Sequence, residues 1–438
     1  MLTTLSRRGL ALGAAATFGA WPRRVFAQDV STCNNAPDTP TAERPPPQVY
    51  WRSISDAELG LAFRCHGMMP EFLRDDITPL GVHYLLNHFA IPDLSPDNYT
   101  VAIGGKVQNP RRIPLTEIQG RQELKQAVTM ECAGTGRRSL NPRPVYVPWD
   151  KECIGTYQWI GTPLAPLLQQ AGINPNAAEV LFSGWDSGVD LGVEHVFERS
   201  LPLAEALRDE VMLAWGANGQ PLLPEHGFPL RLIVPSWYGM ASVKWLRAIT
   251  VLDEPFQGVQ QKQVYIYEKT KDDPQAKPVQ RKHVNSAIMP IGYPDLMSRT
   301  AFVAPGTYTV RGRAWSGNGT VTNVDFSTDG GASWQAAQIQ RTLSDPFAWI
   351  NWQASWNASA GKFVLACRAT DETGQTQPLD PQAVWNLGGN GVNEIAQLPV
   401  LVQDGVGSVL SQIPCQPRLA LPGADLPPVP DAPNTAEG

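Results

Sequence analysis

The 438-residue sequence contains six cysteines but has no Cys-x-x-Cys pair. This absence excludes zinc ribbons, thioredoxin-type dithiols and Cys-x-x-Cys-His haem attachment. Basic residues are also few, because 35 Lys and Arg against 41 Asp and Glu give a net charge of -6. That balance argues against binding to nucleic acid or to an anionic membrane surface. The apolar stretch near the N-terminus is too short and too weakly apolar to predict a permanent membrane span.

Residues 1–27 have the pattern of an export signal. Arg7 and Arg8 precede a stretch of Gly, Ala, Leu and Phe, and Val25-Phe-Ala27 supplies small residues for cleavage. Adjacent arginines in this position are typical of the twin-arginine route. Because that route carries folded proteins, we expect a periplasmic protein that receives any cofactor before export. An ordinary Sec signal or an uncleaved anchor is the alternative.

The changes in composition along the chain predict two folded domains. At 438 residues, with 42% hydrophobic and 17% charged residues, the chain is long enough for two packed cores. The expected organisation is a signal at 1–27, a Pro-rich arm at 28–47, a first domain at 48–255, a connecting segment at 256–300, a second domain at 301–405 and a Pro-rich tail at 406–438.

The two expected domains differ in their sequence patterns. In the first, short β-type runs such as 99–103 and 230–234 alternate with helical stretches at 162–172 and 201–207, which predicts an α+β fold. In the second, period-2 strands such as 307–315 and 321–327 are followed by turn residues, including Asp329-Gly-Gly331. This pattern predicts an all-β immunoglobulin-like sandwich.

One cysteine has surroundings that suit a metal ligand. Cys132 lies in the run Val128-Thr-Met-Glu-Cys-Ala-Gly-Thr-Gly-Arg-Arg138, after a β-branched stretch and before two arginines. A thiolate is a soft ligand for a transition metal, and arginine offers a planar fork of donors to an oxyanion or phosphate. In an exported chain, a disulfide or an inert core position is the alternative for this cysteine.

Several motifs in the same order resemble the sulfite oxidase family of mononuclear molybdopterin oxidoreductases. The run at Cys132 is similar to the family's Cys-Ala-Gly-Asn-x-Arg, and the segments 221–235 and 239–246 are similar to its cofactor-binding segments. Gly312-Arg-Ala-Trp-Ser-Gly317, with 324–334, is similar to its immunoglobulin-like dimerisation domain. The resemblance extends from about Asp76 to Val402 and implies one molybdenum-molybdopterin per chain.

The resemblance also implies roles for individual residues. Cys132 corresponds to the single protein ligand of the metal, Arg137 to the active-site arginine that binds an anion, and Tyr265 to the tyrosine near the metal, with Tyr267 as a close competitor. The cofactor contacts implied in the same way are Tyr84, Asn87, His88, Asp186, His226, Arg231, Ser242, Val243 and Lys244. A turn residue is the alternative for Asp186, and a cap or turn residue is the alternative for His226.

Three positions depart from the family pattern. Leu86 stands where the sulfite enzymes have an arginine before Asn-His, and Asp345 is the best match for a second substrate arginine. Thr135 replaces the usual Asn. Loss of one arginine would weaken an oxyanion site, and an acid at the second position would repel sulfite. The metal site is therefore better supported by the residues than the identity of the substrate.

The expected function is oxidation of sulfite or a related sulfur compound in the periplasm. Because this chain has no haem motif, a separate cytochrome c is the expected acceptor, and the resemblance implies a homodimer or a heteromer with a cytochrome subunit. The alternative within enzymes is a family member acting on another oxyanion or on protein-bound sulfane sulfur. The alternative outside enzymes is an exported binding protein with a structural Cys132. A Cys33–Cys415 disulfide is left open.

Overall fold

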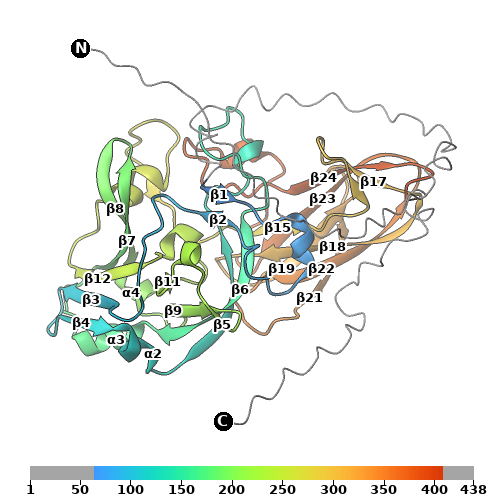
Figure 1. Cartoon of the computed structure of the whole chain (residues 1–438). Helices are drawn as coiled ribbons and strands as arrows, with labels where there is room; N and C mark the ends of the chain where they lie inside the picture. Colours follow the sequence, from blue (N-terminus) through green and yellow to red (C-terminus); the bar gives the residue numbers. More distant parts are fainter. Residues whose placement is uncertain (1–63, 408–438) are drawn as a thin grey trace, which may run out of the picture. The chain divides into compact units, whose positions relative to one another are not determined.

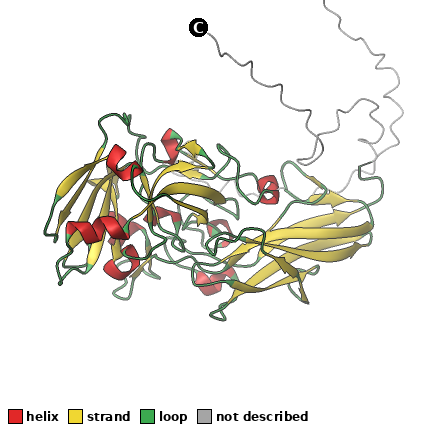
Figure 2. Ribbon diagram, turned by 90° about the horizontal axis from the view of Figure 1, so that it is seen from below, coloured by secondary structure: helices red, strands yellow, loops and turns green. Residues whose placement is uncertain are grey.

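The computed structural model describes residues 64–407. The signal at 1–27, the Pro-rich arm, Cys33, Cys415 and almost all of the Pro-rich tail therefore lie outside the described residues. Figure 2 shows that the regular secondary structure of the described chain is mainly strand, and that its helices are short. Within 64–407, no helix is long and apolar enough to cross a membrane.

The first domain contains two five-stranded sheets (Figure 1). One sheet has the order β4-β3-β12-β7-β8. Its β3–β12 pair is parallel and the other pairs are antiparallel. The other sheet has the order β10-β9-β6-β5, with β11 paired to β9. The strand bounds are β3 Thr100–Gly105, β4 Arg111–Pro114, β5 Leu124–Glu131, β6 Ile154–Pro163, β7 Glu179–Asp190, β8 Val193–Pro202, β9 Met212–Ala217, β10 Gln220–Pro221, β11 Arg231–Ile233 and β12 Leu246–Leu252.

Short helical elements lie between the strands of both domains. The α-helices are α2 Leu115–Gln119, α3 Ala165–Ala171 and α4 Leu203–Ala206. The 3-10 turns are η3 Pro70–Arg74, η4 Arg137–Ser139, η5 Pro224–His226, η6 Gly239–Ala241 and η8 Pro381–Val384, and η7 Gln260–Val264 is a π-helical turn. Two small ribbons complete the set: β1 Cys65–His66 with β2 Leu85–Leu86, and β13 Ile266–Tyr267 with β14 Lys277–Pro278.

The predicted helix at 162–172 begins later than its cap signal indicates. Thr162 and Pro163 pair with β9 as the end of β6, opposite Leu213 and Met212. The helix starts at Ala165 and ends at Gly172, whose φ of +71° is the left-handed conformation that glycine adopts easily. Sheet pairing thus overrides the local capping signal. The helix is shorter than predicted, and the first domain contains less helix than the predicted α+β fold implies.

The second domain consists of two sheets with a shared apolar core. One has the order β15-β18-β22-β21 and the other β16-β17-β24-β23-β19-β20. Their bounds are β15 Asn285–Ile288, β16 Tyr293–Pro294, β17 Ala301–Val303, β18 Gly306–Trp315, β19 Val321–Ser327, β20 Gln335–Ala336, β21 Gln338–Gln340, β22 Ile350–Ala358, β23 Gly361–Asp371 and β24 Ala396–Val402. The predicted strands at 307–315 and 321–327 are β18 and β19.

The core of the second domain draws large side chains from both sheets. Val310, Trp352 and Trp356 come from one sheet, and Phe326 and Leu365 come from the other; all are buried in one cluster. Alternating burial along β22 produces this arrangement, because successive strand residues point to opposite faces. The segment 256–300 is more than a connection, since it supplies β15 and β16 to these sheets.

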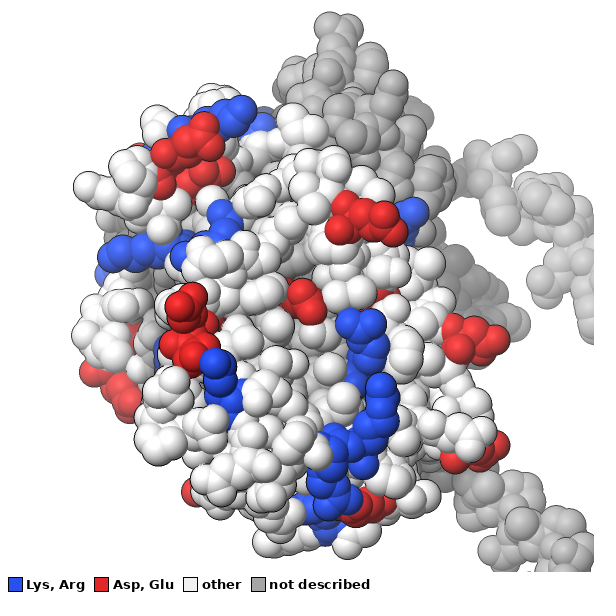
Figure 3. All heavy atoms as spheres, turned by 90° about the vertical axis from the view of Figure 1, so that its left-hand side faces the viewer, with Lys and Arg blue, Asp and Glu red and all other residues white. Residues whose placement is uncertain are grey.

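Charged groups of both signs are scattered over the face of the first domain that lies at the left of Figure 1. In Figure 3, Lys and Arg side chains form a band on one part of this face, with Asp and Glu scattered around it. This mixed pattern agrees with the modest net charge of -6.

Candidate functional site

Cys132 directly follows the buried end of β5. Its N–H donates to the Cys153 carbonyl of the neighbouring strand (3.0 Å), and the Gly134 N–H donates to its Sγ atom (3.4 Å). A hydrogen bond from the Cys153 thiol, the Gly134 amide and the nearby Arg137 lower the pKa of the Cys132 thiol, although burial opposes them. Cys132 is 6% exposed and is not in a disulfide. It is therefore a free thiol whose surroundings favour the thiolate, the form that binds metals.

A pocket opens above this thiol and gathers most of the residues singled out from the sequence. It holds room for about 60 Å³ of solvent within a partly open hollow. The predicted residues that line it are Tyr84, His88, Cys132, Asp186, His226, Arg231, Ser242, Lys244 and Tyr265. These residues come from strands, turns and loops spread over 180 positions of the chain, from 84 to 265.

Two cations line this pocket, and neither forms a salt bridge with a carboxylate among residues 64–407. Arg231 donates to the carbonyls of His226 (2.8 Å) and Ser242 (2.9 Å), and its guanidinium lies 5.0 Å from the Trp159 ring centroid. Lys244 donates to the Leu86 carbonyl (3.1 Å) and to the Asn87 side-chain oxygen. Burial lowers the pKa of Arg231 to about 10 and that of Lys244 to about 7. Asp186 lines the same pocket and favours the charged form of Lys244. An anionic group such as a phosphate would favour the charged forms of both cations in the same way.

Neutral histidines stand beside the cations. Burial, with the charges of Arg231 and Lys244, lowers the pKa of His226 to about 2. Burial also lowers the pKa of His88 to about 3, and its Nε2 atom is 2.6 Å from the Tyr265 hydroxyl. Phe197 packs on the His88 ring at 4.5 Å. These imidazoles are therefore neutral hydrogen-bonding groups, each with one donor and one acceptor nitrogen.

Asp186 is placed by an irregularity in its sheet. The register of β7 against β8 shifts between Ser183 and Ser187, and Asp186 lies in that shift. It is 4% exposed, its Oδ1 atom has no hydrogen-bond partner, and burial raises its pKa to about 6. A turn residue would meet water instead. The structure thus favours a role for Asp186 in the pocket over the turn alternative.

Tyr265 and Tyr267 lie in different surroundings. Tyr265 lines the pocket, and burial together with the nearby Cys132 raises the pKa of its hydroxyl. Tyr267 is not among the lining residues and stacks on His283, with ring centroids 5.7 Å apart. The geometry therefore favours Tyr265 as the tyrosine of the site.

Three other predicted residues stand just behind the pocket wall. The Asn87 oxygen accepts from Lys244. Val243 is a core residue, 1% exposed, whose carbonyl accepts from Leu232. Arg137 donates from Nε to the Gly388 carbonyl and from Nη1 to the Val147 carbonyl, both at 3.1 Å. It also packs on the Tyr146 ring at 5.0 Å, and burial lowers its pKa.

The positions that depart from the family pattern separate in space. Leu86 lines the pocket, whereas Asp345 does not. Thr135 is buried and donates from its hydroxyl to the Cys153 carbonyl (3.2 Å), so it supports the cysteine loop. The pocket therefore presents an apolar side chain at the first expected arginine position and no acid at the second.

Sequence reasoning missed several lining residues, namely His83, Leu85, Met130, Ala133, Phe197, Gly239 and Met240. His83 is the most informative of them, because its Nε2 atom is buried without a partner and burial lowers its pKa to about 4. Its position directly before Tyr84 was the available signal. Gly239 is needed for close approach, since a Cβ there would lie 2.2 Å from the Tyr84 hydroxyl.

The donor set fits a metal carried by an organic cofactor. In the described range 64–407, no group of three or more His, Cys, Asp or Glu residues could hold a metal ion. A metal bound to Cys132 would therefore take its other ligands from a cofactor. Arg231 and Lys244 suit a phosphate, while Asp186 Oδ1 and His83 Nε2 are unpartnered polar atoms that could meet ring nitrogen or oxygen groups.

Comparison with known proteins gives matches across both domains. Residues 88–260 match the oxidoreductase molybdopterin binding domain, and residues 276–400 match the Mo-co oxidoreductase dimerisation domain. Human mitochondrial sulfite oxidase is 33% identical over 340 residues, covering 73% of this chain and 61% of the human protein. Arabidopsis thaliana sulfite oxidase is 31% identical over 350 residues, covering 72% and 85%.

A solved structure is similar over a comparable range. The sulfane dehydrogenase SoxCD from Paracoccus pantotrophus matches with a TM-score of 0.63 and 27% identity, covering 75% of this chain and 83% of the matched chain. This chain spans 61% of the length of the mammalian sulfite oxidases that it matches. Both domain matches, the sequence identity and the shared fold show that the chain belongs to the sulfite oxidase family of molybdopterin-binding oxidoreductases.

Proposed function

We propose that this protein oxidises sulfite or a related sulfur compound and passes the electrons to a separate cytochrome c. One observation carries the proposal: a free Cys132 thiol, held toward its thiolate form, shares one pocket with Arg231 and Lys244. The Mo-molybdopterin cofactor of the family, when bound, supplies two-electron redox chemistry and oxygen transfer from water. The twin-arginine pattern at 1–27 supports a periplasmic location, and the match to a dimerisation domain supports a dimer.

The proposed role of each pocket residue follows from its chemistry. Cys132 would be the protein ligand of the metal. Arg231 and Lys244 would bind the cofactor phosphate, and neutral His83 and His226 with Asp186 would form hydrogen bonds to the ring system. Tyr265, hydrogen-bonded to His88 (2.6 Å), would orient a polar group near the metal.

Arg137 is the cation assigned to the substrate. Two carbonyls fix its guanidinium, and burial removes competing water, so its charge acts strongly on an anion. Charge developing on the substrate during oxidation would be stabilised by the same group.

Sulfane sulfur on a carrier, or another oxyanion, is the second candidate substrate. Leu86 lines the pocket where sulfite enzymes are expected to have an arginine, so the pocket has less charge for a small dianion. The similar SoxCD structure is described as a sulfane dehydrogenase. A larger substrate with fewer charges near the reacting sulfur would suit this pocket better than free sulfite.

Metal analysis and two substrate assays test the proposal. Purified full-length protein is expected to contain about one molybdenum and one pterin per chain, and Cys132→Ser is expected to lose the metal signal or alter its spectrum. Cys367→Ser is the control, because Cys367 is also a buried free cysteine but lies in the core of the second domain.

Sulfite-dependent reduction of ferricyanide or cytochrome c then distinguishes the substrates. Turnover with sulfite supports the first candidate, and turnover only with persulfide or thiosulfate conjugates supports the second. Protein without molybdenum and pterin, unaffected by Cys132→Ser, would contradict the proposal and favour a binding protein with a structural cysteine.

A further inference from the structure

A loop of the second domain lies against the candidate catalytic residues of the first. We define it as the asparagine-glycine loop, Asn386-Leu-Gly-Gly-Asn-Gly391, between η8 and β24. Asn386, Gly389, Asn390 and Gly391 are buried, although the segment has no regular secondary structure. Burial of irregular backbone is costly unless its polar groups find partners, so the destinations of its hydrogen bonds are informative.

Four hydrogen bonds connect the loop to Arg137 and to the residues beside Cys132 and Tyr265. The Gly391 N–H donates to the carbonyl of Ala133, next to Cys132 (2.6 Å). The Gly388 carbonyl accepts from Arg137 Nε (3.1 Å). The Asn390 side chain donates to the carbonyls of Val264 (3.3 Å) and Ile266 (3.2 Å), which flank Tyr265 on both sides.

The loop is held in one shape by its own amides and glycines. The Asn386 Oδ1 atom accepts from the Asn390 N–H (2.9 Å), and its Nδ2 atom donates to the Asn390 carbonyl (2.7 Å). Gly389 and Gly391 have φ values of +56° and +62°, in the left-handed region. A Cβ at Gly389 would lie 2.7 Å from Arg137 Cγ, so the loop fits closely around that arginine.

We propose that the asparagine-glycine loop is a positioning element that sets the relative placement of Cys132, Arg137 and Tyr265, with Asn390 as its central positioning residue. The inference rests on the proposed function for the roles of those three residues. It adds that hydrogen bonds from this loop of the second domain fix the positions of residues in the first domain. A small displacement of a charged group can lower a reaction rate strongly. A loop hydrogen-bonded to Arg137 and to the residues beside Cys132 and Tyr265 limits such displacements.

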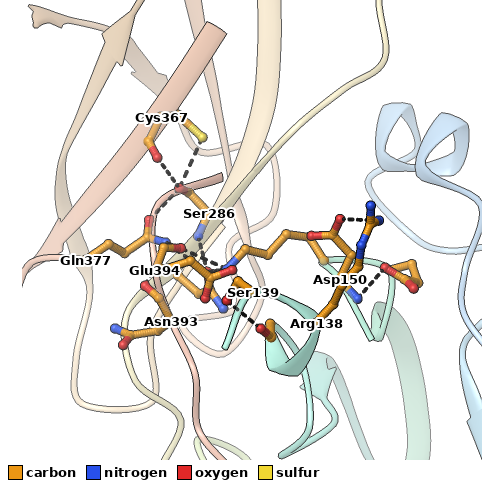
Figure 4. Close-up of polar contacts among 12 residues, drawn as sticks. Arg138, Ser139, Asp150, Ser286, Cys367, Gln377, Asn393 and Glu394 are labelled. Atoms are coloured by element: carbon orange, nitrogen blue, oxygen red, sulfur yellow. Dashed lines mark hydrogen bonds and ion pairs between the residues drawn. The ribbon is translucent and has the colours of Figure 1, made fainter. Parts of the chain in front are cut away.

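A nearby asparagine provides a matched control. Asn393 is 6% exposed, compared with 2% for Asn390, and donates its side-chain amide to the Val284 carbonyl (2.9 Å). Figure 4 shows Asn393 and Glu394 beside Gln377, whose amide donates to the backbone carbonyls of both. Asn393→Ala therefore removes a buried amide from the same segment without touching the neighbours of Tyr265.

The test compares Asn390→Ala with Asn393→Ala in the full-length protein. Hydrogen exchange is measured over peptides carrying 260–268 and 132–139, and molybdenum content and steady-state kinetics are measured on the same samples. Asn390→Ala is expected to keep its metal and to exchange faster in both peptides. It is also expected to change KM for sulfite and the inhibition constant of sulfate by about tenfold, or roughly 1.4 kcal/mol, because its side-chain hydrogen bonds to the Val264 and Ile266 carbonyls are lost.

Equal exchange and equal constants in the two variants would overturn the inference. If Asn390→Ala does not fold, Asn390→Ser keeps one donor and is expected to show a smaller change of the same kind; wild-type values in that variant would overturn the inference as well. Wild-type protein without molybdenum would instead contradict the proposed function, and the exchange comparison would still decide whether the loop positions the two peptides.

Discussion

Arginines in this protein differ sharply in what surrounds them. The guanidinium of Arg137 is buried and bonded to carbonyls, whereas its neighbour Arg138 is 42% exposed and pairs with Asp150 at 3.2 Å. A carbonyl orients a guanidinium without neutralising its charge. Arg137 thus keeps a field that an anion can use, while the exposed pair is largely screened by solvent.

Substitution of these two arginines is expected to separate substrate binding from surface charge. Arg137→Gln should raise KM for an anionic substrate about tenfold or more, because a charged hydrogen bond contributes about 1.5–3 kcal/mol. Arg138→Gln, with the same change in net charge, should leave KM within about twofold. The measurement is steady-state kinetics on variants with equal molybdenum content. Equal KM values would show that Arg137 does not bind the substrate.

The apolar side chain at Leu86 gives a prediction in the opposite direction. Leu86→Arg adds a cation to a pocket that Leu86 already lines, so sulfite should bind more tightly and KM should fall about threefold to tenfold. Leu85→Arg, at the neighbouring lining position, is the control for charge alone. A KM for sulfite that rises in Leu86→Arg would contradict this account of substrate choice.

Single residues were predictable where their local sequence was distinctive. The cysteine between a β-branched run and a glycine turn indicated a loop after a strand, and Cys132 does follow β5. The environment of Asp186 was not predictable, because it depends on a register shift between two strands. His83 was missed since its burial depends on packing against Tyr157, His226 and Gly155, which lie far along the chain.

At the scale of elements, β18 of the second domain contacts the N-terminal part of the first domain. Arg313, on β18, is 1% exposed; its Nε atom donates to the Leu73 carbonyl and its Nη1 atom contacts Asp76, both at 2.6 Å. Its guanidinium also lies 5.0 Å from the Trp349 ring centroid. Arg313 is the buried partner of this contact, because the Asp76 side chain is 38% exposed. Its removal leaves the Leu73 carbonyl without this donor.

Arg313→Met is therefore expected to lower the free energy of unfolding by about 2 kcal/mol. Arg368→Met is the comparison, because Arg368 pairs with Asp325 at 2.9 Å and packs on Trp334 but is 35% exposed, which predicts a loss of about 1 kcal/mol. Urea unfolding followed by tryptophan fluorescence measures both. A smaller loss for Arg313→Met than for Arg368→Met would refute this ranking.

Strands were easier to predict than their partners. The period-2 runs at 307–315 and 321–327 correspond to β18 and β19, because alternation directly encodes a half-buried strand. The pairing of Thr162 with β9, and the contribution of 285–288 to the second domain, depend on non-local contacts. The asparagine-glycine loop has no periodicity, so its place beside Arg137 was visible only in three dimensions.

At the scale of the whole molecule, buried neutral histidines link stability to pH. Burial lowers the pKa of His83 to about 4, of His88 to about 3 and of His226 to about 2. An unfolded histidine has a pKa near 6.5. Below pH 6.5 the unfolded chain binds protons at these histidines that the folded chain does not. The stabilisation of the folded state by neutral histidines is therefore fully present above pH 6.5 and is lost as the pH falls toward the folded-state pKa values.

The free energy of unfolding is expected to fall between pH 6.5 and 4.5, by up to about 1.4 kcal/mol per pH unit for each buried histidine. The melting temperature is expected to fall with it. Differential scanning calorimetry at fixed ionic strength measures this dependence. In His83→Gln, unfolding should take up about one proton fewer, so the free energy of unfolding should decline less steeply as the pH falls. A decline of unchanged slope in that variant would show that His83 does not contribute.

The order of the contacts along the chain has a consequence for how the protein is made. Cys132 lies in the first third of the sequence, but the loop that bonds to Ala133 and Arg137 follows 250 residues later. A ribosome must therefore translate nearly the whole chain before the walls around the thiol are complete. Nascent chains that stop before residue 386 would lack the asparagine-glycine loop, so the hydrogen bonds to Ala133 and Arg137 form only after most of the chain has been synthesised.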